Sequence, residues 1–309
     1  MPKTPPGPSF RQQGGVLYFR PVPRSCPRSH RPILPLTAVL LGTACARVVN
    51  LSDPAGPRFE GRYAPAAVAA AEPTGPAILV ATFNVKLARR VDRAIEVIQA
   101  TPALRDADVL AMQELDDAAA DALARALGLN YVYFPGAVHP TDHKLFGPAI
   151  LSRWPIDSAW KLVLPHESNV RRQRRTATAA LVRVRGVPVR VYAVHLEIQT
   201  RASRAEREDQ VAAVLADAAA APEPVIIAGD FNSWSIGEYL TARGFAWPTR
   251  DLGRTVLAFG WDHIFARGLS PAGDAAGVVR DVRGASDHRP VWAGLAMERS
   301  PVAAAGTAP

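Results

Sequence analysis

The chain has 309 residues, of which 48% are hydrophobic and 21% are charged, and this is enough for one large globular domain, or two at most. Lysine and arginine outnumber aspartate and glutamate by 36 to 28, but six of the basic residues lie in residues 1–46, which contain no acidic residue. The remaining 30 basic and 28 acidic residues nearly balance. Total charge therefore does not indicate a nucleic-acid-binding protein, and any attraction for polyanions must come from local patches.

Residues 1–46 have the order of features that is typical of an export signal. Arg28 and Arg31 precede a short apolar stretch at residues 33–41, and small residues follow at 42–46. A basic region, an apolar core and small residues in this order mark a signal peptide, and the core is too short to remain as a membrane-spanning anchor. The sequence therefore predicts an exported protein, periplasmic or extracellular.

Two cleavage sites fit this signal. Cleavage after Ala46 follows the pattern of an ordinary signal peptide. The stretch Gly42–Cys45 instead resembles a bacterial lipobox, in which Cys45 would carry a lipid and tether the protein to a membrane. Both cysteines, Cys26 and Cys45, lie in residues 1–46, so the exported body has no disulfide and depends on its core and on any bound metal.

The rest of the chain is predicted to contain a linker, one domain and a tail. Residues 47–74 are rich in proline, glycine and alanine without the periodicity of a strand or a helix, and we expect a flexible linker there. Residues 75–297 carry regular patterns and form the predicted domain. Residues 298–309, which are small and rich in alanine, are predicted to be a disordered tail.

Within this domain, short apolar runs predict strands and longer amphipathic runs predict helices. The short apolar runs lie at residues 77–83, 108–113, 148–152, 178–184, 187–194, 225–229, 263–266 and 291–295. Helices are predicted at residues 89–100, 117–127 and 203–219. Gly128 ends the second helix, Ser203 and Glu206 form a capping box at the third, and Arg185-Gly186 predicts a hairpin turn. Because strands and helices mix without strict alternation, the pattern favours mixed or antiparallel sheets over a doubly wound parallel sheet.

Polar residues recur where these apolar runs end. Asp230 and Asn232 stand two apart after the run 225–229, so in extended geometry a carboxylate and an amide would project to the same side. Polar residues also stand at the edges of four other apolar runs, at Asn84, Gln113-Glu114, His195 and Asp287-His288. A turn explains each of them alone, but five together indicate a functional site, because active residues are commonly held at element ends on a rigid scaffold.

Seven short motifs follow one another along the domain. They are Thr82-Phe83-Asn84, Met112-Gln113-Glu114, Gly147–Arg153, His195-Leu196, Gly229–Asn232, Asp262–Phe265 and Ser286-Asp287-His288. In this order they resemble the motifs of the endonuclease/exonuclease/phosphatase superfamily, which has the deoxyribonuclease-I-like fold. The resemblance implies an α/β (α+β) fold, a four-layer sandwich of two mixed β-sheets with helices on the outer faces, with the active site at one end of the sheets.

The resemblance also implies a metal-assisted attack of water on a phosphoester. Glu114 would be the principal ligand of a hard divalent cation, Mg²⁺ with retained waters or else Mn²⁺, and Asn84 and Asp287 would complete or support that metal site. Asp230 would orient or deprotonate the attacking water, or protonate the leaving group. Asn232 would hold a phosphate oxygen.

Two imidazoles and an arginine are implied near the phosphate. His288 would contact the phosphate, with Asp262 fixing its ring and stabilising its charged form, and His195 would be a second imidazole at a position that varies in the family. Arg175 is either the phosphate-facing arginine that family members often carry there or part of a solvated basic loop. Glu197, two residues beyond His195, either pairs with an imidazole or faces solvent, and it receives no role.

Three classes of function remain open. The first is an exported Mg²⁺-dependent nuclease or phosphodiesterase. The basic cluster at residues 171–175 supports it, because local clusters of basic residues bind the phosphate backbone of nucleic acids. The second is a phospholipid or small-phosphoester hydrolase, similar to a sphingomyelinase or a phosphatase, which a lipid on Cys45 would favour. The third is a non-catalytic binding relative, which the retained motif carboxylates disfavour. We expect a monomer whose partner is a nucleic acid or another phosphoester substrate.

Overall fold

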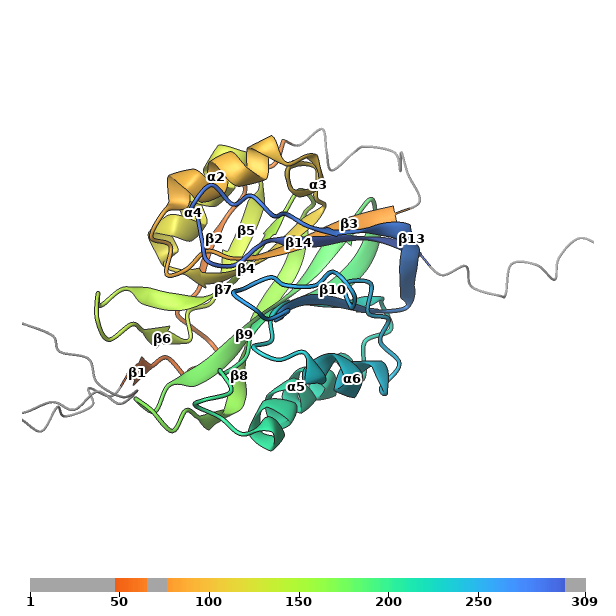
Figure 1. Cartoon of the computed structure of the whole chain (residues 1–309). Helices are drawn as coiled ribbons and strands as arrows, with labels where there is room; N and C mark the ends of the chain where they lie inside the picture. Colours follow the sequence, from red (N-terminus) through yellow and green to blue (C-terminus); the bar gives the residue numbers. More distant parts are fainter. Residues whose placement is uncertain (1–47, 66–76, 298–309) are drawn as a thin grey trace, which may run out of the picture. The chain divides into compact units, whose positions relative to one another are not determined.

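Two β-sheets pack face to face, and helices cover the outer face of each (Figure 1). The computed structural model describes residues 48–65 and 77–297, which belong to one compact unit. The predicted export signal at residues 1–46 and the predicted tail at 298–309 lie outside the described residues. Within the described ranges, no helix is both long enough and apolar enough to cross a membrane.

The first sheet is mixed. Its strands are β1 (Val49–Asn50), β2 (Phe59–Gly61), β3 (Ala77–Asn84), β4 (Val109–Leu115), β5 (Asn130–Tyr133), β6 (Ala137–Val138), β7 (Leu145–Ser152), β13 (Leu269–Val278) and β14 (Val291–Met297). The strand order is β1-β6-β7-β4-β3-β14-β13, and β5 joins β2 to β7. β3 and β4 run parallel, whereas the other pairings of this sheet are antiparallel.

The second sheet is also mixed. Its strands are β8 (Ile156–Glu167), β9 (Arg174–Val184), β10 (Val187–His195), β11 (Val225–Asp230) and β12 (Asp262–Arg267), in the order β12-β11-β10-β9-β8. Only β10 and β11 run parallel among these neighbours. The antiparallel pair β9–β10 turns at Arg185-Gly186, which confirms the predicted hairpin.

Five helices of the described chain lie outside the sheets. α2 (Val91–Ala100), α3 (Pro102–Arg105) and α4 (Asp117–Leu127) cover the first sheet, and α5 (Arg204–Ala218) and α6 (Ser235–Thr241) cover the second. The structure confirms the predicted end of one helix and the predicted start of another. Gly128 follows α4 with a φ of 63°, in the left-handed region that favours glycine. Ser203 and Glu206 form the predicted capping box at α5.

Alternating side chains separate three apolar layers. Val80 of β3 belongs to the cluster between the two sheets, together with Val191 of β10. Phe83 of the same strand points the other way and belongs to the cluster beneath α2 and α4. Val211 of α5 belongs to a third cluster, under the second sheet. Each such side chain contributes about 1.5–3 kcal/mol when it is fully buried. The four layers of the predicted sandwich are therefore confirmed.

The expected flexible linker at residues 47–74 is wrong for part of its length. β1 pairs with β6, and β2 pairs with β5. In addition, Lys161 Nζ donates to the carbonyl oxygens of Leu51 at 3.0 Å and Gly56 at 2.6 Å. Strands of two or three residues are too short to show a period in the sequence. Residues 66–76 lie outside the described residues.

The same segment is joined to the loop between β8 and β9. The Val48 N–H donates to the Arg171 carbonyl oxygen at 2.9 Å. Asn50 makes two more bonds, donating from Nδ2 to the Arg172 carbonyl oxygen and accepting at Oδ1 from the Arg174 N–H, both at 2.8 Å. These contacts attach the start of the described chain to the second sheet.

Candidate active site

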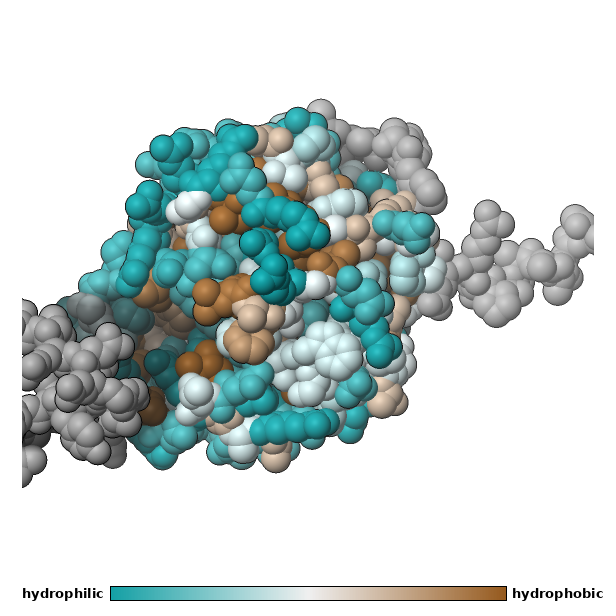
Figure 2. Space-filling view, in the orientation of Figure 1, coloured by the Kyte–Doolittle hydropathy of each residue, from teal (hydrophilic) through white to brown (hydrophobic). Residues whose placement is uncertain are grey.

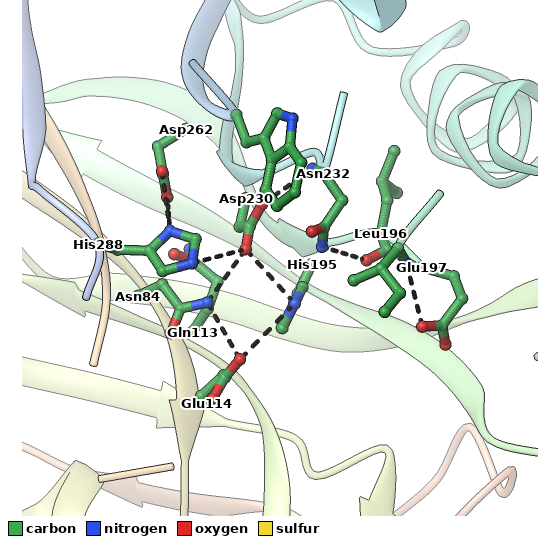
Figure 3. Close-up of polar contacts among 12 residues, drawn as sticks. Asn84, Gln113, Glu114, His195, Leu196, Glu197, Asp230, Asn232, Asp262 and His288 are labelled. Carbon is green, nitrogen blue, oxygen red and sulfur yellow. Dashed lines mark hydrogen bonds and ion pairs between the residues drawn. The ribbon is translucent and has the colours of Figure 1, made fainter. Parts of the chain in front are cut away.

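The ends of four strands meet at one end of the sandwich. β3 and β4 are parallel neighbours in one sheet, and β10 and β11 are parallel neighbours in the other. At or near their carboxyl ends stand Asn84, Glu114, His195 and Asp230. Asp230 also lies opposite Asp262, the first residue of the antiparallel strand β12. Figure 3 shows these side chains pointing toward one another from both sheets.

Glu114 reaches this cluster because β4 is distorted there. Leu110 and Met112 face the helices, so regular alternation would turn Glu114 the same way. The pairing of β4 with β7 shifts between Met112 and Leu115, and Glu114 has a φ of 61°. A bulge of this kind re-aims a side chain beside an active site, and a strained non-glycine residue costs about 1–3 kcal/mol. Glu114 Oε2 is fixed by the Leu87 N–H at 2.8 Å.

The Asn84 side chain links the carboxylates of the two sheets. Its Nδ2 donates to Glu114 Oε1 at 3.2 Å and to Asp230 Oδ2 at 3.1 Å. Its Oδ1 accepts from the Lys86 N–H at 3.0 Å. Asn84 therefore orients the carboxylates of Glu114 and Asp230, and the backbone uses one of the two lone pairs of its Oδ1.

Asp230 and Asn232 project from a turn and not from extended backbone. β11 ends at Asp230, and Asn232 has a φ of 49°, so the expected alignment by strand geometry is wrong. The Asn232 N–H donates to Asp230 Oδ1 at 2.9 Å, and Asn232 Nδ2 donates to the Leu196 carbonyl oxygen at 3.0 Å. A Cβ added to Gly229 would lie 2.0 Å from the Val194 carbonyl oxygen, so glycine is required where β10 and β11 approach each other.

His288 is a charged imidazole between two aspartates. Its Nδ1 donates to Asp262 Oδ2 at 2.9 Å, and its Nε2 lies 3.7 Å from Asp230 Oδ2. Burial opposes the charge, but the carboxylates of Asp262 and Asp230 outweigh it and raise the pKa of His288 to about 10. The ring is therefore positive at neutral pH, and Asp262 fixes its orientation.

Asp230 and His195 are both pushed toward their neutral forms. Burial raises the pKa of Asp230 toward neutrality, against the opposing charge of His288. Burial, followed by the charges of Arg175 and His288, lowers the pKa of His195 well below its ordinary value. His195 Nε2 lies 3.6 Å from Asp230 Oδ2 and 4.0 Å from Glu114 Oε1. A carboxylate with a pKa near neutrality, next to imidazoles of opposite protonation state, is suited to proton transfer.

Asp287 stands apart from this cluster. Its Oδ2 pairs with Lys86 Nζ at 2.8 Å, and both side chains are substantially exposed. No hydrogen bond or ion pair in the described part of the chain joins Asp287 to Glu114 or Asn84. The Ser286 hydroxyl donates to the Asn84 carbonyl oxygen at 2.7 Å. This bond fixes the segment that carries Asp287 and His288 beside the end of β3.

Arg175 enters the site from β9, and Glu197 holds it. Arg175 Nε and Nη2 donate to the two Glu197 carboxylate oxygens, both at 3.0 Å, and the side chains are 6% and 1% exposed. Arg175 lines a small cavity with His195 and Phe146. The alternative of a solvated basic loop is therefore wrong for Arg175, and both alternatives considered for Glu197 are wrong.

The acidic residues of the site fit a divalent metal ion. Asp230, Asp262 and His288 are buried and offer ligand atoms that lie within 4.8 Å of one another. A histidine ligand must be neutral, so metal binding by all three would require His288 to lose its proton. Glu114 offers a further carboxylate, one-fifth exposed, which faces the same Nε2 of His195 as the Asp230 carboxylate does. Carboxylate oxygens of this kind are the usual ligands of hard divalent cations.

Comparisons with known proteins agree with this geometry. The chain matches the model of the Endonuclease/Exonuclease/phosphatase family over residues 81–288. No curated protein matches the chain by sequence.

Among solved structures, the fold resembles an endonuclease/exonuclease/phosphatase from Beutenbergia cavernae, with a TM-score of 0.60, 22% identity and 74% of each chain covered. It also resembles a mannosyl-6-phosphatase from Bacteroides thetaiotaomicron, with a TM-score of 0.56, 19% identity, and 71% of this chain and 100% of that chain covered. Sphingomyelinase C from Streptomyces griseocarneus gives a TM-score of 0.54 and 20% identity, with 71% of this chain and 99% of that chain covered. At these identities the likenesses show the fold, whereas the family match spans the whole site. The chain therefore belongs to the endonuclease/exonuclease/phosphatase family.

Proposed function

We propose that this phosphoester hydrolase is a Mg²⁺-dependent phosphodiesterase, most specifically an exported nuclease. The observation that supports this best is the buried Asp230 carboxylate, which faces a charged imidazole on one side and a neutral imidazole on the other. A buried carboxylate without a compensating role would be costly. This arrangement supports a catalytic role over a non-catalytic binding role.

Each residue has a separate task in the proposed hydrolysis. Asp230 accepts a proton from the attacking water, since its pKa is raised toward neutrality. The water oxygen bonds to phosphorus while the bond to the leaving oxygen breaks, and the leaving group departs as an alcohol after it takes a proton from solvent. His288 donates from Nε2 to a phosphoryl oxygen, and its positive charge is maintained by Asp262. Asn232 has a second Nδ2–H for another phosphoryl oxygen, because the first is used by Leu196. A divalent cation held by Glu114, Mg²⁺ or Mn²⁺, would supply further positive charge near the phosphate.

The basic loop beside Arg175 supports a polyanionic substrate. Arg171, Arg172 and Arg174 lie between or beside the ends of β8 and β9, next to the cavity that Arg175 lines. Arg172 and Arg174 are partly neutralised by Glu167, at 2.9 Å and 3.5 Å. We propose that this loop contacts the phosphates of a nucleic-acid strand that flank the cleaved bond.

An apolar rim supports a second candidate, a hydrolase of phospholipids or of small phosphoesters with an apolar group. Leu257 and Phe259 are 79% and 48% exposed on the loop before Asp262, and Val256 of that loop pairs with the backbone of His288. Trp234, two residues beyond Asn232, is also 41% exposed. Figure 2 shows apolar residues reaching the surface among hydrophilic ones. An apolar acyl or aromatic group bound at this rim would lie next to the phosphate site.

A parallel substrate panel tests these candidates. The full chain is incubated with plasmid DNA, RNA, bis-p-nitrophenyl phosphate and sphingomyelin, each with Mg²⁺ and with Mg²⁺ plus excess EDTA. We expect EDTA-sensitive cleavage of the nucleic acids and of the model diester. Turnover of sphingomyelin alone would replace the nuclease proposal by the lipid one. Absence of EDTA-sensitive turnover on all four would contradict the proposed metal-dependent phosphodiesterase.

We further propose that the protein is exported, acts as a monomer in the periplasm or outside the cell, and is lipidated on Cys45. The support is the signal pattern of residues 1–46. Mass spectrometry of the protein isolated from its native membranes is expected to show an N-terminal peptide that begins at an acylated Cys45. An unmodified peptide that begins at Arg47 would indicate ordinary cleavage after Ala46.

A further inference from the structure

Glu197 holds the Arg175 guanidinium in one orientation. Its Nε and Nη2 donate in parallel to the two oxygens of Glu197, which is the fork-to-fork geometry that fixes a guanidinium plane. Glu197 is itself fixed, because its Oε1 also accepts from the Ile198 N–H at 3.1 Å, and its own N–H donates to Gln210 at 3.1 Å. Burial disfavours the charges of both residues, but Glu197 raises the pKa of Arg175 and Arg175 lowers the pKa of Glu197. Both partners therefore stay ionised.

Two buried polar atoms beside this pair have no protein partner. Arg175 Nη1 and Thr176 Oγ1 lack a hydrogen bond within the described residues, and both residues line the cavity that also contains His195. A Cβ on Gly136, in the wall of the same cavity, would lie 2.5 Å from Thr176 Oγ1, so glycine leaves space next to that hydroxyl. An unsatisfied buried donor costs about 1–3 kcal/mol, and more when it is charged. Such a cost is offset when a ligand supplies the acceptor.

A comparable ion pair at the far end of the same sheet leaves no buried side-chain nitrogen without a partner among the described residues. Arg190 Nε donates to Glu223 at 2.6 Å, while Arg190 Nη1 donates to the Asp217 carbonyl oxygen at 3.1 Å. Both pairs join an arginine of the β9–β10 hairpin to a glutamate just outside a strand. The Arg175 pair differs because its Nη1 is buried without a partner, in a residue that lines a cavity together with His195.

We propose that Glu197 is a positioning residue, which orients Arg175 so that Nη1, together with the Thr176 hydroxyl, binds an oxygen of the substrate phosphate beside His195. The proposal deepens the phosphoester-hydrolase function and rests on it. Glu197 does not touch the substrate. Its effect is to keep the guanidinium plane fixed, so that less side-chain entropy is lost when the phosphate binds.

The test measures binding of inorganic phosphate separately from turnover. Phosphate is titrated by calorimetry into the wild-type chain, Glu197→Gln, Arg175→Lys and the double variant, and kcat and KM are measured on bis-p-nitrophenyl phosphate. Glutamine keeps the size of Glu197 but presents an N–H to one arm of the fork, and lysine keeps the charge of Arg175 without the fork. Loss of one charge-assisted hydrogen bond is expected to weaken phosphate binding by about 10- to 100-fold in each single variant. KM should rise more than kcat falls.

The double variant and a matched control separate positioning from stability. Because Glu197 and Arg175 act as one unit, the double variant should bind phosphate no more weakly than the single variants. Glu223→Gln, in the comparable pair, should leave phosphate affinity unchanged even where it lowers the melting temperature. Circular dichroism confirms folding, and Arg175→Lys carries the test if Glu197→Gln does not fold.

The outcomes distinguish this inference from the function on which it rests. Unchanged phosphate affinity in folded Glu197→Gln or Arg175→Lys would overturn the positioning role, even if the wild-type chain hydrolyses phosphoesters. An equal loss of affinity in Glu223→Gln would overturn it too. If the variants bind phosphate more weakly than the wild type, but the wild type hydrolyses no phosphoester, the positioning role is supported and the proposed function is contradicted.

Discussion

Replacing Asp230 by asparagine is expected to lower kcat by about two to four orders of magnitude, the usual contribution of a positioned proton acceptor. Asparagine keeps an oxygen for the Asn232 N–H, which now bonds to Asp230 Oδ1, so the turn after β11 should survive. It cannot accept a proton from water. The wild type and variant are compared by steady-state hydrolysis of bis-p-nitrophenyl phosphate and by thermal unfolding.

The fold of Asp230→Asn should be retained, because the substitution removes a fully buried charge that burial disfavours. Asp157→Asn is a suitable control, since Asp157 forms an exposed ion pair with Arg183, which lies next to the β9–β10 turn, at the opposite end of these strands from Arg175 and His195. The control should keep wild-type kcat. If Asp230→Asn retained near-native turnover, Asp230 would not be the residue that accepts the proton.

The second large effect is expected for His288→Ala, with a fall in kcat of about 10²- to 10³-fold, as for loss of one donor that stabilises transition-state charge. The imidazolium donates toward Asp262 through Nδ1, so only Nε2 is free to face a phosphoryl oxygen. Alanine also leaves the buried Asp262 carboxylate without its partner, and the free energy of unfolding should fall. Both effects are measured, by kinetics and by denaturant titration.

Asp262→Asn separates the two effects of His288. Asparagine can still accept from His288 Nδ1, but it no longer holds the ring in its charged form. We expect a smaller loss of kcat at neutral pH than in His288→Ala, and the ratio of variant to wild-type kcat at the same pH should partly recover as the pH is lowered and the ring regains its proton. Equal kcat values for wild type and His288→Ala would show that the imidazole does not act on the phosphate.

The convergence of the site could be predicted because it follows from topology. Asn84, His195 and Asp230 stand at the carboxyl ends of parallel strands, and parallel neighbours must end on the same side of a sheet. The buried runs and the end signals of α4 and α5 were sufficient to place these strands and helices. The resemblance then related the two sheets, which local patterns cannot do.

Other parts of the site could not be read from local sequence. The orientation of Glu114 depends on a bulge against β7, and the pairing of Lys86 with Asp287 joins residues that are distant in sequence. The contact of Arg175 with Glu197 did have a signal. If the antiparallel pairing is continued outward from the predicted turn at Arg185-Gly186, Arg175 lies opposite the residue that precedes Glu197.

The missed strands have physical reasons as well. β8 shifts register at two places along β9, and β13 shifts against β14 between Pro271 and Ala276. In an irregular strand, successive side chains do not alternate between the buried and the exposed face, so apolar and polar residues do not alternate in its sequence. β5 is buried along its whole length and is too short to be distinguished from a turn of helix.

The bond between Val48 and Arg171 sets a limit on where the active site could work. Three peptide steps separate Cys45 from Val48, and an extended chain covers at most about 3.6 Å per residue, or about 11 Å here. Val48 is bonded to the loop that leads into Arg175. If Cys45 carries a lipid, the distance from the bilayer surface to the point where Val48 is bonded to that loop cannot exceed about 11 Å. Phosphoesters lying in or on the membrane would then meet the site directly, whereas a long duplex would have to approach along the surface. The chemical state of Cys45 would therefore restrict the accessible substrates as well as the location.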